Sequence, residues 1–313
     1  MRGWWQDLTD LVLPAECGGC GRPRAVLCPE CRAALSGAVP SRVRPVPEPR
    51  GLPVVHAAAP YEDEVRAALL AHKERGVLTL AAPLGAALAG AVRAALACRQ
   101  EKGPGGRPAR LDGRLRPGNG QLGSESGRAM TDGAVLLVPV PSSRRAVRAR
   151  GHDPARRIAL AAAGELRRTG TSARVLGVLR QRRTVADQSG LNSRQRLGNL
   201  AGALEVASGG ARFLAGGGRV VVVDDLMTTG ASLAEAARAV RAAMTDAYAA
   251  ATWEAAEVRR AGERMPETTA EATATGSIRT QAVRGMLGMS AVGDLICAAV
   301  VAAPPDSFEI NRN

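Results

Sequence analysis

The chain has 313 residues, with 42 Lys and Arg against 29 Asp and Glu, which gives a net charge of +13. Of its apolar residues 60 are Ala, and Phe, Tyr and Trp together number only seven. Because large apolar side chains are few, one core that spans the whole chain is not expected, and we predict insertions that lie outside the core. Only Lys73 and Lys102 are lysines, a bias typical of GC-rich coding sequence, so the charge alone does not indicate nucleic acid binding.

The amino-terminal segment carries Asp7 and Asp10 where a secretory signal would have its apolar run, so we predict no signal peptide. Residues 77–92 are uncharged but contain Pro83, Gly85 and Gly90, and they fall short of the roughly 20 strongly apolar residues of a membrane span. We therefore expect a helix of a cytoplasmic protein here and no membrane span.

Two Cys-x2-Cys pairs lie within residues 1–50, which we interpret as a zinc-binding module and linker. In a reducing cytoplasm, paired cysteines indicate metal rather than a disulfide. Four thiolates fill a tetrahedral site, so the predicted zinc would be structural. A redox-active disulfide is the alternative. The predicted ligands are Cys17, Cys20, Cys28 and Cys31.

Residues 51–313 alternate short apolar runs with helical patterns. The runs 134–139, 174–179, 219–224 and 294–302 are nearly continuous in Val, Leu, Ile and Ala, as is typical of buried parallel strands. Helices are expected over 83–98, 154–168 and 233–244. The pattern predicts an α/β doubly wound domain, a parallel sheet with helices on both faces. Disordered insertions are expected at 99–132, which has almost no large apolar residue, and at 247–281, which lacks an apolar face, with a solvated helix over part of 247–281 as the alternative.

The most specific segment is residues 220–232, where a buried strand runs into Asp224 and Asp225 and then into a small-residue turn before a helix. Backbone N–H groups at a helix N-terminus bind phosphate, and neighbouring carboxylates can accept hydrogen bonds from vicinal sugar hydroxyls. A turn that only caps the helix is the alternative. The predicted phosphate cradle comprises Met227, Thr228, Thr229, Gly230, Ala231 and Ser232.

This segment resembles the 5-phosphoribosyl-1-pyrophosphate (PRPP) signature of type I phosphoribosyltransferases. Together with the cysteine pairs, Tyr61 through the 73–76 segment, the block 138–153 and the block 182–199, it is similar to the late-competence ComF family of that superfamily. The chain has Asp153-Pro154 where members of the family mostly have Asn-Gln.

The resemblance implies a type I phosphoribosyltransferase-like domain that binds PRPP with Mg2+ and transfers or binds its 5-phosphoribosyl group, with no residue that identifies the acceptor. Asp224 and Asp225 would be the catalytic pair that holds the ribose, and 228–232 would hold its 5-phosphate. The implied diphosphate loop comprises Ser142, Ser143, Arg144 and Arg145, with Lys73 as a further phosphate contact. The implied flexible hood over the site contributes Arg182, Arg183, Thr184 and Gln188.

Basic residues cluster between 134 and 200, where 14 Arg stand against Asp153, Glu165 and Asp187. We interpret the cluster first as a diphosphate site; a solvated basic face or a nucleic acid surface is the alternative. The second functional hypothesis is a non-catalytic competence factor that contacts DNA or a protein of the DNA-uptake machinery through its zinc module and basic face. A dimer is the expected oligomeric state.

Overall fold

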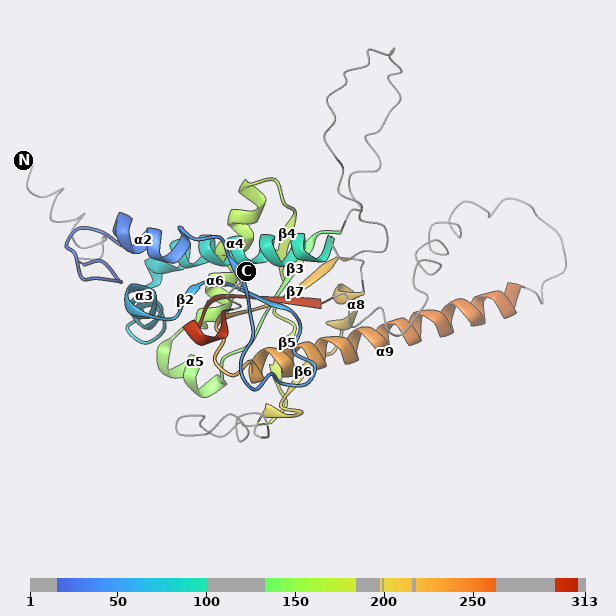
Figure 1. Ribbon diagram of the computed structural model, residues 1–313. Helices are drawn as coiled ribbons and strands as arrows, with labels where there is room; N and C mark the ends of the chain where they lie inside the picture. The colour runs from blue at the N-terminus through green and yellow to red at the C-terminus, as the bar shows by residue number, and fades with distance from the viewer. Residues whose placement is uncertain are drawn as a thin grey trace, which may run out of the picture.

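A six-stranded sheet forms the centre of the computed structural model, which describes residues 16–100, 133–183, 198, 200–215, 218–262 and 296–308 (Figure 1). All neighbouring strands are parallel except the first two, which are antiparallel. In spatial order the strands are β1 (Ser41–Val43), β2 (Val55–Pro60), β8 (Ile296–Ala303), β7 (Arg219–Leu226), β3 (Val135–Pro139) and β4 (Ala173–Val175).

Both faces of the sheet are buried, which explains why its central strands lack polar alternation. Along β7, Val221 and Val223 belong to one hydrophobic cluster and Val220 and Val222 to another. Successive side chains of a strand point to opposite faces, so the two clusters are the cores on the two sides of the sheet. The expected α/β architecture with a mostly parallel sheet is confirmed.

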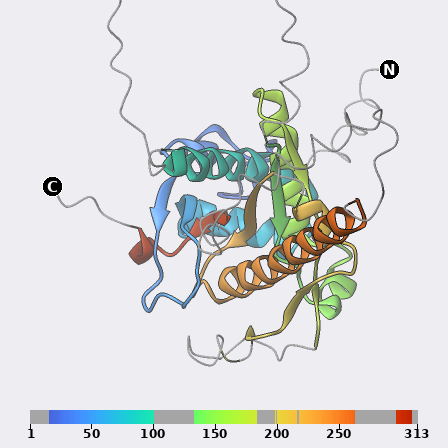
Figure 2. The same ribbon diagram turned by 90° about the vertical axis from the view of Figure 1, so that its right-hand side faces the viewer.

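Helices cover each face. On one side lie α4 (Ala81–Gln100) and α6 (Pro154–Arg168), with α2 (Pro29–Ser36) and α3 (Asp63–Lys73) near the amino-terminal end of the chain. On the other side lie α9 (Ala231–Gly262) and the short α8 (Ala211–Leu214). Figure 2 shows α4 and α9 on opposite sides of the strands, and Figure 1 shows the far end of α9 extending beyond the sheet.

Two predicted elements differ from the structure. The run 174–179 is divided, because its first part is β4 and its last residue begins β5 (Leu179–Gln181), which pairs with β6 (Leu204–Val206) in a separate antiparallel hairpin. The helix expected over 233–244 continues as α9 to Gly262, so residues 247–262 of the expected insertion are helical. The remainder of both expected insertions, 101–132 and 263–281, lies outside the described residues.

Sequence patterns missed the two strands at one edge of the sheet. β1 falls within residues 1–50, where we expected only a zinc module and linker, and β2 is too rich in Ala to give an apolar signal. The segment Leu78–Cys98 is the one helical stretch, among the residues described, that is apolar and long enough to cross a membrane. Most of its apolar window is buried, because α4 packs against α6 and β8 as a core helix.

Candidate functional site

The candidate site lies at the carboxyl edge of the sheet, where ligands bind in open α/β folds. β3 and β7 are neighbours, and the Val140 N–H donates to the Val223 carbonyl at 2.9 Å, so the loop after β3 runs beside the acidic end of β7. A cleft of about 1160 Å³ opens there. It is lined by residues of the diphosphate-loop, hood and acidic-pair predictions, and also by Lys73.

The acidic pair forms the floor of this cleft. The Asp225 backbone N–H donates to Asp224 Oδ1 at 2.9 Å, and the Asp225 carboxylate is paired with Lys73, whose Nζ lies 2.9 Å from Oδ2. Burial, together with the neighbouring charge of Asp225, raises the pKa of Asp224 well above its ordinary value, although Lys73 opposes the shift. Perturbed carboxylates in a cleft are typical of functional sites.

The predicted phosphate cradle surrounds a small hollow of about 20 Å³ next to Asp224, at the N-terminus of α9. The first N–H groups of a helix have no intrahelical acceptor and carry the positive end of the helix dipole. Gly230 has a φ of +72°, and a Cβ there would lie 3.1 Å from Leu52, so glycine suits this turn. Met227 also lines the hollow, but its side chain is buried in the core and its N–H donates to the Ala302 carbonyl.

The loop after β3 is more structured than expected. Ser143 caps a helix, α5 (Arg144–Arg150), by accepting from the Ala146 N–H at 3.1 Å. Asp153 holds the loop from the other side: its carboxylate accepts from the backbone N–H and the hydroxyl of Ser142, both at 3.4 Å, while it caps α6. Asp153-Pro154, which departs from the pattern of the resembled family, therefore has a positioning role here. The sequence signal for this role is an N-cap residue, Asp153, followed by Pro154 at the first position of the helix.

The predicted hood segment follows β5 in the β5–β6 hairpin, which is separate from the six-stranded sheet. Arg182 and Arg183 border the cleft, whereas Thr184 and Gln188 lie outside the described residues. The hairpin is fixed to α9 by the buried Glu235, whose carboxylate accepts from the Leu204 N–H at 3.0 Å and from the Arg238 guanidinium at 2.7 and 2.8 Å. The helix that starts at the predicted phosphate cradle thus also holds the β5–β6 hairpin, from which the predicted hood begins. Sequence reasoning missed Glu235.

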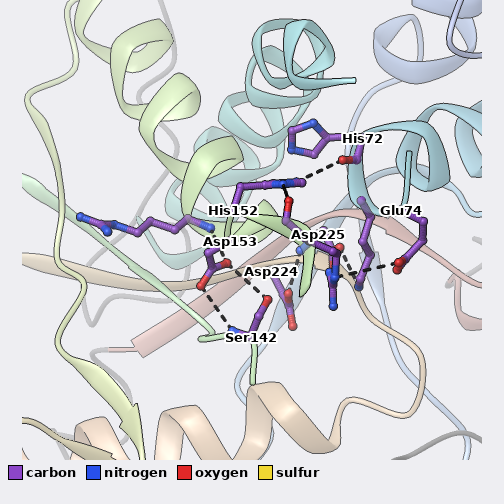
Figure 3. Close-up of polar contacts among 10 residues, drawn as sticks. His72, Glu74, Ser142, His152, Asp153, Asp224 and Asp225 are labelled. Carbon is purple, nitrogen blue, oxygen red and sulfur yellow. Dashed lines mark hydrogen bonds and ion pairs between the residues drawn. The ribbon is translucent and has the colours of Figure 1, made fainter. Parts of the chain in front are cut away.

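The end of α3 contributes residues that sequence reasoning did not assign to the site. Figure 3 shows His72, Glu74 and His152 beside the acidic pair. The Nε2 of His152 lies 3.2 Å from the His72 carbonyl, and its Nδ1 lies 3.1 Å from that of Arg150. Both histidines are buried, and burial lowers the pKa of His72. These contacts join α3 to the carboxyl end of α5.

The four predicted zinc ligands come together at a separate place, where the amino-terminal segment packs on α3 and α4. Their sulfur atoms all lie within 4.8 Å of one another, and the Cys20 and Cys28 sulfurs are 3.6 Å apart. A tetrahedron with Zn–S bonds of about 2.3 Å has sulfur–sulfur edges of about 3.8 Å, so the cluster fits a four-thiolate metal site. All six cysteines have free thiols.

The surroundings of Cys17 favour its thiolate, whereas the pKa values of Cys28 and Cys31 are raised, chiefly by burial and by neighbouring thiols in the case of Cys31. Burial opposes ionisation of Cys17, but N–H donors from Cys28, Cys20 and Gly19 outweigh it and lower the pKa of Cys17 to about 6. The Cys28 N–H lies 3.3 Å from the Cys17 sulfur. A Cβ on Gly19 would lie 2.7 Å from the Cys31 sulfur, so only glycine allows this close approach. The four cysteines form a candidate metal site, and four thiolates are a ligand set typical of structural zinc.

No protein-family model matches the chain, and a search of curated proteins finds no match.

Proposed function

We propose that the protein is a phosphoribosyltransferase-like member of the ComF family that binds PRPP in the cleft at the carboxyl edge of the sheet. The observation that carries this proposal is the convergence of three groups on one cleft: the acidic pair, the N-terminus of α9 and the Ser142–Arg145 loop. PRPP has a matching set of groups, namely vicinal hydroxyls, a 5-phosphate and a diphosphate.

Each part of the cleft has a role in this proposal. The helix N-terminus holds the 5-phosphate through backbone N–H groups, helped by the hydroxyls of Thr228 and Ser232. Asp224 and Asp225 accept hydrogen bonds from the ribose hydroxyls. Arg144, with the two serines before it, binds the diphosphate through charge-assisted hydrogen bonds. During transfer the bond between the anomeric carbon and diphosphate breaks, the diphosphate leaves with the electron pair, and the acceptor nucleophile bonds to that carbon.

A divalent cation belongs to the proposal as a companion of the ligand. Bound Mg2+ would neutralise charge on the leaving diphosphate. Carboxylate oxygens are ligands that Mg2+ accepts, so the acidic pair and PRPP together fit it. The base of the hood and the Asp153-held loop keep the arginines in position. The four thiols suit a reducing compartment, and we place the protein in the cytoplasm.

The experiment is isothermal titration of the zinc-loaded protein with PRPP in the presence of Mg2+. We expect binding to the wild type and loss of binding in Asp225→Asn. Asp246→Asn, an exposed aspartate on α9, is the matched control and should bind like the wild type. Equal binding in all three proteins, or none in the wild type, would remove the site assignment. Diphosphate release with a panel of bases then identifies the acceptor.

A second candidate function is contact with DNA. It is favoured by α5, which presents Arg144, Arg145 and Arg148 as exposed side chains and contains no acidic residue. Phosphate contacts of this kind weaken steeply with salt. The test is DNA binding at increasing salt for the wild type and for Arg148→Ala, which lies outside the cleft lining. No binding at low salt would eliminate this function.

A further inference from the structure

Three consecutive residues at the end of α3 contact three parts of the candidate site. The His72 carbonyl lies 3.2 Å from His152, the Lys73 ammonium lies 2.9 Å from Asp225, and the Glu74 carboxylate lies 3.9 Å from the Arg150 guanidinium (Figure 3). The first contact, between buried histidines, holds the end of the helix against the end of α5, while the third involves the exposed Glu74 and adds little. Lys73 is therefore held in place at the acidic pair rather than reaching it by chance.

The ion pair sits at the boundary between core and cleft. The Asp225 side chain is only 7% exposed, whereas that of Lys73 is 34% exposed and borders the cleft. With its Nζ 2.9 Å from Oδ2, the Lys73 ammonium is the cation that pairs with the buried Asp225 carboxylate.

An ammonium in this place competes with a metal ion. Two adjacent carboxylates are ligands of the kind that hard divalent cations prefer. An ion such as Mn2+ that bound the pair directly would have to displace Lys73 from Asp225 Oδ2 or bind beside a positive charge. The composition gives a second indication that this position needs a lysine, because only two of the 42 basic residues of the chain are Lys. A compact ammonium with a flexible stem can move between partners more readily than a planar guanidinium fork.

We propose that Lys73 is a positioning residue that serves as the built-in counter-cation of the acidic pair. In the ligand-free protein its ammonium takes the place of a divalent cation at Asp225, so the protein alone binds such cations weakly. A polyphosphate ligand brings its own cation and attracts Lys73 toward phosphate oxygens, since Lys73 borders the same cleft as Ser142–Arg145. The identity of that ligand rests on the proposed function; the weak cation binding does not.

The test is a titration with Mn2+, followed by the electron paramagnetic resonance signal of the free ion, on zinc-loaded protein without PRPP. We expect Lys73→Met to bind Mn2+ more tightly than the wild type by about 5–150-fold, the usual range for coupled sites. Lys73→Arg, which keeps the charge, should stay close to the wild type. The double variant Lys73→Met with Asp225→Asn should lose the gain.

The result that would overturn the proposal is a folded Lys73→Met protein with Mn2+ affinity equal to or below that of the wild type, or an equal gain in Lys73→Arg. If Lys73→Met does not fold, Lys73→Gln replaces it, because the amide can still donate to Asp225 without a charge; it should show the same gain. Failure of the wild type to bind PRPP would remove the proposed function and leave this result standing.

Discussion

Glu235 offers the sharpest test of how the site is held together. It is 5% exposed, and its carboxylate accepts from the Leu204 N–H and from Arg238. In Glu235→Ala the buried Leu204 N–H loses its acceptor, which costs about 1–3 kcal/mol. Arg238 is half exposed, so loss of its ion pair adds at most about 1 kcal/mol. We expect the free energy of unfolding to fall by about 1–4 kcal/mol.

Glu205 supplies a matched control on the same hairpin. It pairs with Arg180 at 2.8 Å and with Arg182 at 3.6 Å, but its side chain is 35% exposed. Solvent-exposed ion pairs contribute little, so Glu205→Ala should cost less than about 1 kcal/mol. The measurement is urea unfolding of zinc-loaded protein followed by circular dichroism. An Ala substitution at Glu235 that costs no more than the one at Glu205 would refute the idea that α9 anchors the hood.

The pH dependence of the Glu235 effect has a definite sign. Burial by itself would raise the pKa of Glu235, but the hydrogen bonds from Arg238 and Leu204 outweigh it and the pKa is lowered. A carboxyl group with a depressed pKa stabilises the folded state above its ordinary value of 4.5, and this stability is lost as the pH falls through the folded-state pKa. The difference between wild type and Glu235→Ala should therefore be full at pH 7 and shrink in acid.

Three further predictions concern the metal, the acidic pair and the cradle. Cys28→Ser should lose the bound zinc, as measured by atomic absorption, while Cys297→Ser, a core cysteine, should keep it; equal zinc in both would contradict the cluster. Asp224→Asn should melt at a higher temperature than the wild type at pH 7. The pKa of Asp224 is raised in the folded state, so its ionisation costs stability as the pH rises above the ordinary pKa of 3.8. Identical melting temperatures at pH 7 would contradict this prediction. Gly230→Ala should lose about 1–2 kcal/mol and weaken PRPP binding, whereas Gly76→Ala, with a φ of +68° but open space around it, should lose stability alone.

The sequence predicted the parts of the fold that have strong local signals. The Val-rich β7 and the Pro154–Arg168 helix have such signals, because continuous β-branched residues and an Asp-Pro start are unambiguous. β2 was missed because its VHAAAP sequence has too little apolar contrast. The 174–179 run was joined into one strand because local patterns do not show that Leu179 leaves the sheet to pair with Val206. That pairing depends on residues far away in the sequence.

In the candidate site, too, the residues with a local sequence signal could be predicted and those with only distant contacts could not. The acidic pair and the Ser142–Arg145 loop could be predicted because each lies in one continuous motif, and the structure brings both to one cleft. His72, Glu74 and Glu235 could not, because their partners lie 76 to 80 residues away for the α3 contacts and 31 residues away for Leu204. Side chains that position a site through distant contacts leave no local pattern. Lys73 was singled out by composition, but only the structure pairs it with Asp225.

The cysteine cluster and the cleft are linked by α3. The first turn of α3 packs against the cysteine segment: a Cβ on Gly19 would lie 3.3 Å from that of Glu64, and Val65 shares a hydrophobic cluster with Cys31. The last residue of the same 11-residue helix is Lys73, at the acidic pair. Because packed cores transmit strain, we expect a metal bound by the four cysteines to help hold α3, and with it Lys73, in place.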